Sequence, residues 1–123
     1  MKILDSSCWI EIFSKGPLYT KFEEFLSNPY DLIVPTITLT EVFKKLLIDR
    51  TEKEALYIIA QMEQCKIADL TQDLALEASK YGNRFKLPLA DSIIYATAMK
   101  HNATLYTLDK HFENLPNVKY FQK

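Results

Sequence analysis

Short apolar runs alternate with longer stretches of helical periodicity along most of the chain. The runs at residues 2–4, 32–34, 67–70, 104–106 and 118–121 have the length and composition of strands, and the last has the polar end of an edge strand. Between the runs, apolar side chains recur at helical spacing, most clearly at Leu39, Val42, Phe43, Leu46 and Leu47. Strands that alternate with helices are typical of a parallel sheet covered on both faces. We therefore predict an α/β fold, a three-layer α/β/α sandwich with a central, mostly parallel sheet.

Polar residues that can cap helices mark where several of these helices begin. Thr38, with Glu41 three residues later, matches a capping box and predicts a helix start at this position. A further helix is predicted for residues 51–64, with helical spacing at Leu56, Ile59 and Ala60. Thr71 is predicted to cap the helix that follows.

The stretch from residue 87 to residue 109 predicts a buried helix, a short turn and a strand. Pro88 is suited to the first turn of a helix, because that turn has unpaired N–H groups in any case. Apolar residues then fill both sides of the helical wheel, with Leu89, Ile93 and Ala96 on one and Ile94, Tyr95 and Ala98 on the other. Asp91 lies within this apolar first turn, so its carboxylate must be hydrogen-bonded, paired or bound to a cation.

Length and composition place the chain among ordinary globular proteins. Its 123 residues fit one domain, residues 1–123, and 48% apolar with 25% charged residues argues against disorder. With only two Gly there is little room for a Gly-rich phosphate loop, and Cys8 and Cys65 show no zinc or redox spacing. No apolar run resembles a signal peptide or a membrane span, so we expect a cytoplasmic protein with no membrane partner. A net charge of −1 requires any nucleic acid to bind at a local basic patch.

Four acids stand at the boundaries of predicted elements. Asp5 ends the first strand, Glu41 opens a helix after the second, Asp91 opens the buried helix, and Asp109 follows a later strand. In a parallel α/β sheet, the carboxyl ends of strands and the amino ends of the following helices share one edge, where ligands bind. Each acid also has a purely structural explanation. Asp5 and Asp109 can cap helices, and Glu41 can complete the capping box. Asp91 can interact favourably with the dipole of its helix. The coincidence of all four favours an oxygen-lined cation site.

The residues around these acids resemble a known family. The blocks at residues 4–7, 38–42, 89–98 and 105–112 resemble the four signature blocks of PIN domains, in order and spacing, over nearly the whole chain. The length is closest to the VapC-type toxins of toxin–antitoxin pairs. The resemblance implies that Asp5, Glu41, Asp91 and Asp109 form an acidic quartet that binds Mg²⁺ or Mn²⁺ and cleaves RNA. It also implies a homodimer, a cognate antitoxin, and supporting hydroxyl groups at Ser6 and Thr107.

The chemistry of the four acids fits this implication. Mg²⁺ and Mn²⁺ prefer oxygen ligands, and a water bound to such a cation ionises more readily and can attack phosphorus. We expect Asp5 and Asp91 to contact the metal, Asp109 to act through water or a second ion, and Glu41 to position a metal or water. His111 is interpreted as a surface or capping residue. Candidate contacts to RNA are Lys44, Lys45, Arg50, Arg84, Lys86, Lys110 and His111.

Two other classes of function remain open from the sequence. A PIN-like fold can serve as a non-catalytic binding protein, although the presence of all four acids argues against this. Another Mg-dependent phosphate-handling α/β enzyme is the second alternative. A haloacid-dehalogenase-like phosphatase requires Asp-x-Asp after the first strand, where this chain has Asp5-Ser6-Ser7. A receiver domain requires paired early acids and a phosphorylatable Asp near the middle of the chain, which are not evident.

Overall fold

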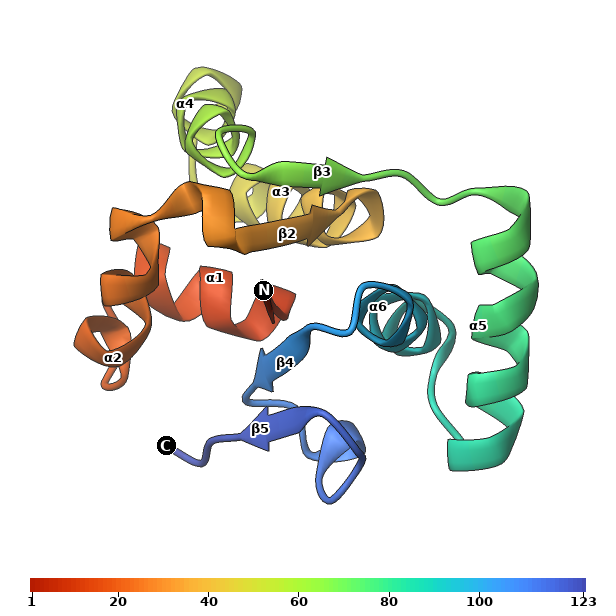
Figure 1. The fold of residues 1–123 in the computed structure, drawn as a ribbon. Helices are drawn as coiled ribbons and strands as arrows, with labels where there is room; N and C mark the ends of the chain where they lie inside the picture. Colours follow the sequence, from red (N-terminus) through yellow and green to blue (C-terminus); the bar gives the residue numbers. More distant parts are fainter.

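A five-stranded sheet lies between two layers of helices in the computed structural model, which describes residues Met1–Lys123 (Figure 1). The sheet order is β3-β2-β1-β4-β5, and every neighbouring pair is parallel. The strands are β1 (Lys2–Leu4), β2 (Leu32–Pro35), β3 (Lys66–Ala68), β4 (Thr104–Thr107) and β5 (Val118–Tyr120). The predicted three-layer α/β/α sandwich is confirmed, and its sheet is entirely parallel.

Helices connect each strand to the next, except where a short turn leads into β5. The α-helices are α1 (Ser6–Phe13), α2 (Tyr19–Glu23), α3 (Thr36–Asp49), α4 (Glu52–Met62), α5 (Gln72–Phe85) and α6 (Leu89–Lys100). Single 3-10 turns are η1 (Glu24–Ser27), η2 (Pro29–Asp31) and η3 (Lys110–Phe112). None of the helices has the length and apolar character needed to cross a membrane.

The two faces of the sheet build two separate cores. Leu4 and Val34 point toward α1, α3 and α4, whereas Ile3, Ile33 and Leu105 point toward α6. Successive residues of a strand face opposite sides, so even these short strands supply both cores. Helix α5 packs mainly against α6 as an outer layer, and its Tyr81 and Phe85 also reach the core on this side of the sheet (Figure 1).

Helix α6 is surrounded by protein, as its apolar wheel predicts. Every residue from Asp91 to Ala98 is buried. The prediction that Leu89 fills one side of this wheel is wrong. Its side chain is 79% exposed at the first position of the helix, outside the packed region. The helix also approaches α5 closely, since a Cβ on Gly82 would lie 3.2 Å from the Cβ of Ser92. Asp91 is thus held in a rigid, closely packed element.

The capping box predicted at Thr38 and Glu41 is wrong. Helix α3 begins at Thr36, directly after Pro35, so Thr38 lies inside the helix and its hydroxyl is buried without a hydrogen-bond partner. A capping box exists instead at Thr51 and Glu54, which begin α4. The predicted buried face of α4 also differs, because the core side of this helix is made by Ala55, Ile58, Ile59 and Met62. Glu41 is consequently free of any capping role.

Candidate functional site

The site lies where the order of the sheet reverses. The chain passes from β1 to β2 and β3 on one side, then returns to place β4 on the other side of β1 (Figure 1). In parallel α/β sheets such a switch point leaves a crevice at the carboxyl ends of the two strands. Asp5 follows β1 and Asp109 follows β4, so both acids border this crevice.

Asp5 is held at the base of the crevice by hydroxyl groups. Its side chain is 3% exposed, and its Oδ2 accepts hydrogen bonds from Ser7 Oγ at 2.9 Å and Thr107 Oγ1 at 2.8 Å. It makes no side-chain cap to α1, so the capping explanation for this acid does not apply. Burial raises the pKa of Asp5, and the nearby charge of Asp109 adds to the rise, while the two hydroxyl groups oppose it.

The same hydroxyl groups connect the two loops that carry the acids. Thr107 Oγ1 accepts from the N–H of Asp109 at 2.9 Å, and Ser7 Oγ accepts from the N–H of Leu108 at 3.0 Å. The backbone after β4 is therefore fixed relative to Asp5. The family resemblance predicts a supporting hydroxyl at Thr107, whereas Ser7 is not among the predicted site residues. Its position two residues after Asp5 was the available signal.

Asp91 and Asp109 meet at His111. The Nδ1 of His111 lies 3.2 Å from Asp91 Oδ2 and 3.0 Å from Asp109 Oδ1. Ligand atoms from these three residues all lie within 4.8 Å of one another. The capping explanation holds for Asp109, whose Oδ1 also accepts from the N–H of His111 at 2.9 Å. His111 lies directly against the acids, so it is more than the surface residue expected from the sequence.

Like charges govern the electrostatics of this cluster. Burial, together with the charges of Asp109 and Asp5, raises the pKa of Asp91 to about 7, and His111 opposes this rise. Asp109 and Asp91 in turn raise the pKa of His111. Neighbouring carboxylates repel one another when all are ionised, so a positive charge beside them stabilises the ionised forms. A protonated imidazole of His111 would supply part of that charge.

Glu41 completes the acidic edge from α3. One carboxylate oxygen of Glu41, Oε1, is buried and has no hydrogen-bond partner. Burial raises the pKa of Glu41, with a further contribution from the charge of Asp5. An unpaired buried carboxylate oxygen is costly, and a cation or its bound water would satisfy it.

The donor set fits a hard divalent cation. Asp91 and Asp109 offer carboxylate oxygens within one cluster, to which His111 adds an imidazole nitrogen, and the carboxylates of Asp5 and Glu41 lie close enough for their charges to act on the same site. Oxygen ligands without any Cys are the choice of Mg²⁺ and Mn²⁺. Positive charge at this point would relieve the repulsion among Asp5, Asp91 and Asp109.

Comparison with known families agrees with this geometry. Residues 2–118 match the family model of the PIN domain. The chain belongs to the PIN domain family. None of the curated proteins compared with the sequence matches it. The family assignment covers every strand up to the start of β5 and all four acids.

Solved structures with the same fold include toxins of toxin–antitoxin pairs. A toxin–antitoxin complex from Klebsiella pneumoniae is similar with 25% identity over 100% of both chains and a TM-score of 0.83. VapC20 of Mycobacterium tuberculosis, described as a sarcin-ricin loop cleaving toxin, has 16% identity over 91% of this chain and 92% of its own, with a TM-score of 0.76. FitAcB from Neisseria gonorrhoeae has 19% identity, coverage of 99% and 97%, and a TM-score of 0.70.

The structure separates the basic residues that were candidates for RNA contact. Lys45 lines a cavity together with Glu41, whereas Lys44 lines an apolar groove between α3 and α4. Arg50 donates to the carbonyl oxygen of Phe13 at 3.0 Å, away from the acids. Arg84 lies 5.9 Å from the ring centres of two aromatic residues of α5.

The remaining basic candidates lie at the ends of helical segments. Lys86 takes a left-handed backbone conformation with φ 58° where α5 ends, and Lys110 is exposed in η3 next to Asp109. Of the predicted contacts on this PIN domain, the ones placed beside the acidic edge are Lys45, Lys110 and His111.

Proposed function

We propose that this PIN domain, taken as a single unit of residues 1–123, is a metal-dependent endoribonuclease and the toxin of a toxin–antitoxin pair. The observation that carries the proposal is the meeting of Asp91 and Asp109 at the switch point of the sheet, close enough to Asp5 for their charges to interact, with Glu41 on its margin. Family membership and the fold shared with toxins support it, and VapC20 is a relative described as cleaving RNA of the sarcin-ricin loop.

Each acid has a separate task in this proposal. Asp5 and Asp91 would hold Mg²⁺ or Mn²⁺, and Asp109 would act through water or a second ion. The cation, when bound, lowers the pKa of a water and neutralises charge on the reacting phosphate. Thr107 and Ser7 keep the Asp5 carboxylate in one orientation, while Ser6, which faces Glu41, supports the carboxylate that positions water. No protein nucleophile is needed.

The proposal also assigns partners and location. The PIN domain would act in the cytoplasm as a homodimer on RNA and would be restrained by a cognate antitoxin. The similar structure from Klebsiella pneumoniae, solved as a toxin–antitoxin complex, supports the antitoxin assignment. A non-catalytic binding role is the alternative, and the unpaired oxygen of Glu41 favours a cation site over it.

Cleavage of single-stranded RNA by the purified protein tests the function. We expect endonucleolytic products with Mg²⁺ or Mn²⁺, no products with EDTA, and restored cleavage when metal is returned in excess. RNA binding without cleavage at any metal concentration would contradict the proposal and favour the binding role. Mapping the ends of the products would also name the preferred sequence.

A further inference from the structure

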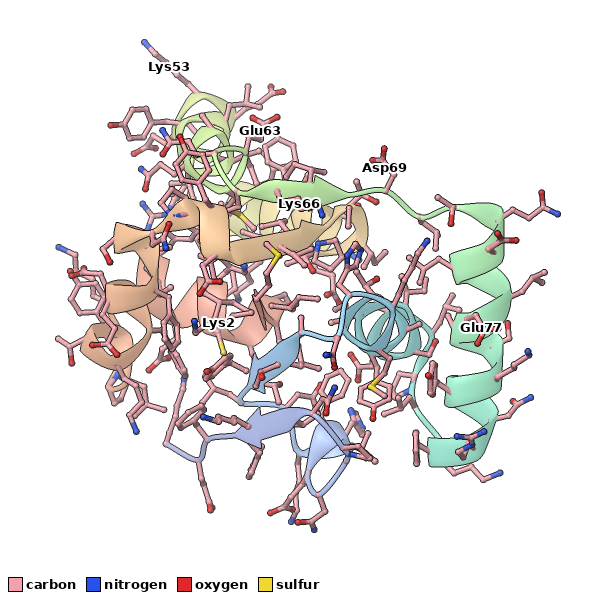
Figure 2. The ribbon with its side chains drawn as sticks, viewed as in Figure 1. Lys2, Lys53, Glu63, Lys66, Asp69 and Glu77 are labelled. Atoms are coloured by element: carbon pink, nitrogen blue, oxygen red, sulfur yellow. The ribbon has the colours of Figure 1, made fainter.

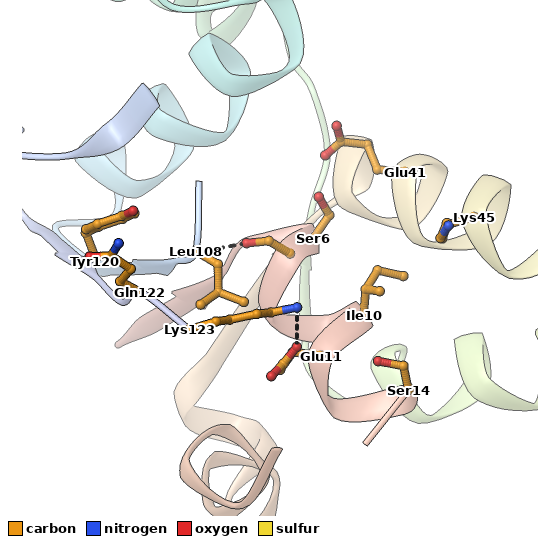
Figure 3. Close-up of a pocket in the computed structure, with 11 residues that line it drawn as sticks. Ser6, Ile10, Glu11, Ser14, Glu41, Lys45, Leu108, Tyr120, Gln122 and Lys123 are labelled. Carbon is orange, nitrogen blue, oxygen red and sulfur yellow. Dashed lines mark hydrogen bonds and ion pairs between the residues drawn. The ribbon is translucent and has the colours of Figure 1, made fainter. Parts of the chain in front are cut away.

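A cavity of about 700 Å³ opens beside the acidic edge and shares Glu41 and Ser6 with it (Figure 3). Its walls come from α1, from α3 and from the segment that follows β5. Glu41 and Ser6 lie in the upper part of the lining, and the contact between Lys123 and Glu11 lies below them (Figure 3). A chain that enters the acidic site from this side must pass between these walls.

Lys45 is the cation of this cavity without a close partner. It stands one helical turn after Glu41, so the two side chains share one side of α3. Its Nζ lies 4.0 Å from Oδ2 of Asp49, and both side chains are more than half exposed, so this ion pair is weak. The ammonium group is therefore available to a phosphate that lies beside the acidic site.

The neighbouring Lys44 provides a contrast. It lies on a different side of α3, where it borders a groove made mainly by apolar side chains such as Leu39, Phe43 and Leu47. The two lysines are adjacent in sequence and equal in charge. Because only Lys45 lines the cavity that contains Glu41, their effects on a ligand in that cavity should differ.

The C-terminal wall of the cavity is held by a buried carboxylate. Glu11 on α1 is 2% exposed, its Oε2 accepts from the N–H of Leu18 at 2.7 Å, and its Oε1 lies 3.0 Å from Lys123 Nζ. A buried carboxylate is strongly destabilising unless such partners are present, so the contact with Lys123 is favoured. The contact brings the half-exposed Lys123 side chain to the cavity and opposes the negative charge of Glu11, which would otherwise repel a phosphate.

We propose that this cavity binds the RNA strand on one side of the reacting phosphate, with Lys45 contacting a neighbouring phosphate. The inference rests on the proposed ribonuclease function and extends it. Single-stranded RNA is bound by grooves that combine a cation for the backbone with aromatic surface for a base, and Tyr120 from β5 supplies the aromatic side chain here. Glu11 is a positioning residue that acts through Lys123.

Paired variants of the two adjacent lysines test the proposal. Binding of a short fluorescein-labelled single-stranded RNA is measured by anisotropy in EDTA, across a series of salt concentrations. We expect Lys45→Gln to weaken binding about two- to fivefold and to reduce the slope of log K against log salt by about 0.7, as for one phosphate contact. Lys44→Gln should leave both nearly unchanged. In the metal-dependent cleavage assay, Lys45→Gln should raise KM with little change in kcat.

A second pair of variants tests the C-terminal wall. Lys123→Gln removes the charge that pairs with Glu11, whereas Lys119→Gln removes an exposed lysine near the ring of Tyr106, outside the cavity lining. We expect Lys123→Gln to raise KM and Lys119→Gln to leave it unchanged.

Two failures are distinguishable in these experiments. A protein that cleaves RNA, but in which Lys45→Gln behaves as Lys44→Gln does, would overturn the cavity assignment and leave the ribonuclease proposal standing. A correctly folded protein that neither binds nor cleaves RNA would overturn the ribonuclease proposal itself.

Discussion

Replacing Asp91 by Asn is expected to reduce metal-dependent RNA cleavage by roughly a hundredfold or more, because the loss of a metal contact removes several kcal/mol of charge stabilisation. The fold should survive. Asp91 is buried in a helix that is packed on all sides, and Asn has nearly the same shape. Burial, together with repulsion from Asp109 and Asp5, raises the pKa of Asp91 to about 7, so the neutral amide should raise the free energy of unfolding of the metal-free protein at pH 8.

Asp69→Asn is the matched control for this variant. Asp69 also follows a strand of the same sheet, β3, but it is exposed and projects away from the molecule (Figure 2). Cleavage rates and thermal denaturation of both variants are compared with the unmodified protein. Cleavage that stays within a few-fold of normal in Asp91→Asn, while remaining sensitive to EDTA, would contradict the assigned role of Asp91.

The second large effect is a pH-dependent stabilisation by metal. The folded-state pKa values of Asp5, Glu41, Asp91 and His111 are all raised, so their contributions to the stability of the metal-free protein are present at low pH. The contribution of Asp91 is full below about pH 4 and is lost as the pH rises through about 7. Metal binding requires the ionised carboxylates, so its affinity rises over the same range.

Thermal denaturation with Mn²⁺ at pH 6 and pH 8 measures this linkage. We expect a larger rise in Tm at pH 8, with stabilisation of about 2.7 kcal/mol when the metal is a hundredfold above its Kd. Asp91→Asn should lose most of the effect at both pH values. Equal stabilisation at the two pH values, or full stabilisation of the variant, would show that the ion binds elsewhere.

The positions of the acids could be predicted because they depend on topology. In a parallel sheet, every strand ends on the same edge, and the switch point lies between the two neighbouring strands β1 and β4. An acid that follows either of these strands borders the crevice, whereas Asp69, which follows β3, does not (Figure 2). Asp5 follows β1 and Asp109 follows β4. The buried start of α6 could also be read from the apolar residues around Asp91, because such a pattern allows no exposed face.

The capping box was predicted at the wrong position because the same local pattern occurs twice in the chain. Thr-x-x-Glu occurs at Thr38 and again at Thr51, and both satisfy the spacing of a capping box. Only the second begins a helix, since Pro35 lets α3 start earlier and carries Thr38 into the core. The spacing of Thr and Glu alone does not show this difference, which depends on where the helix begins after Pro35.

The contacts of individual side chains were beyond the sequence for a related reason. Lys44 and Lys45 differ by 100° around α3, and which one faces the acids depends on how the helix is rotated against the sheet. His111 meets Asp91 because η3 folds back over the start of α6, a contact between segments with no local pattern in common. Such contacts follow from tertiary packing.

Anomalous diffraction from crystals soaked in MnCl₂ is the most direct test of whether the acidic edge binds a divalent cation, because it locates the ion without reference to activity. The account predicts an anomalous peak at the switch point of the sheet, about 2.1 Å from carboxylate oxygens of Asp5 and Asp91, the bond length of a small hard cation. Asp109 should lie within reach of the same ion or of its waters. The absence of a peak at this edge, or an ion bound by His111 and Asp109 without Asp5, would contradict the assignment of Asp5 and Asp91 as metal ligands.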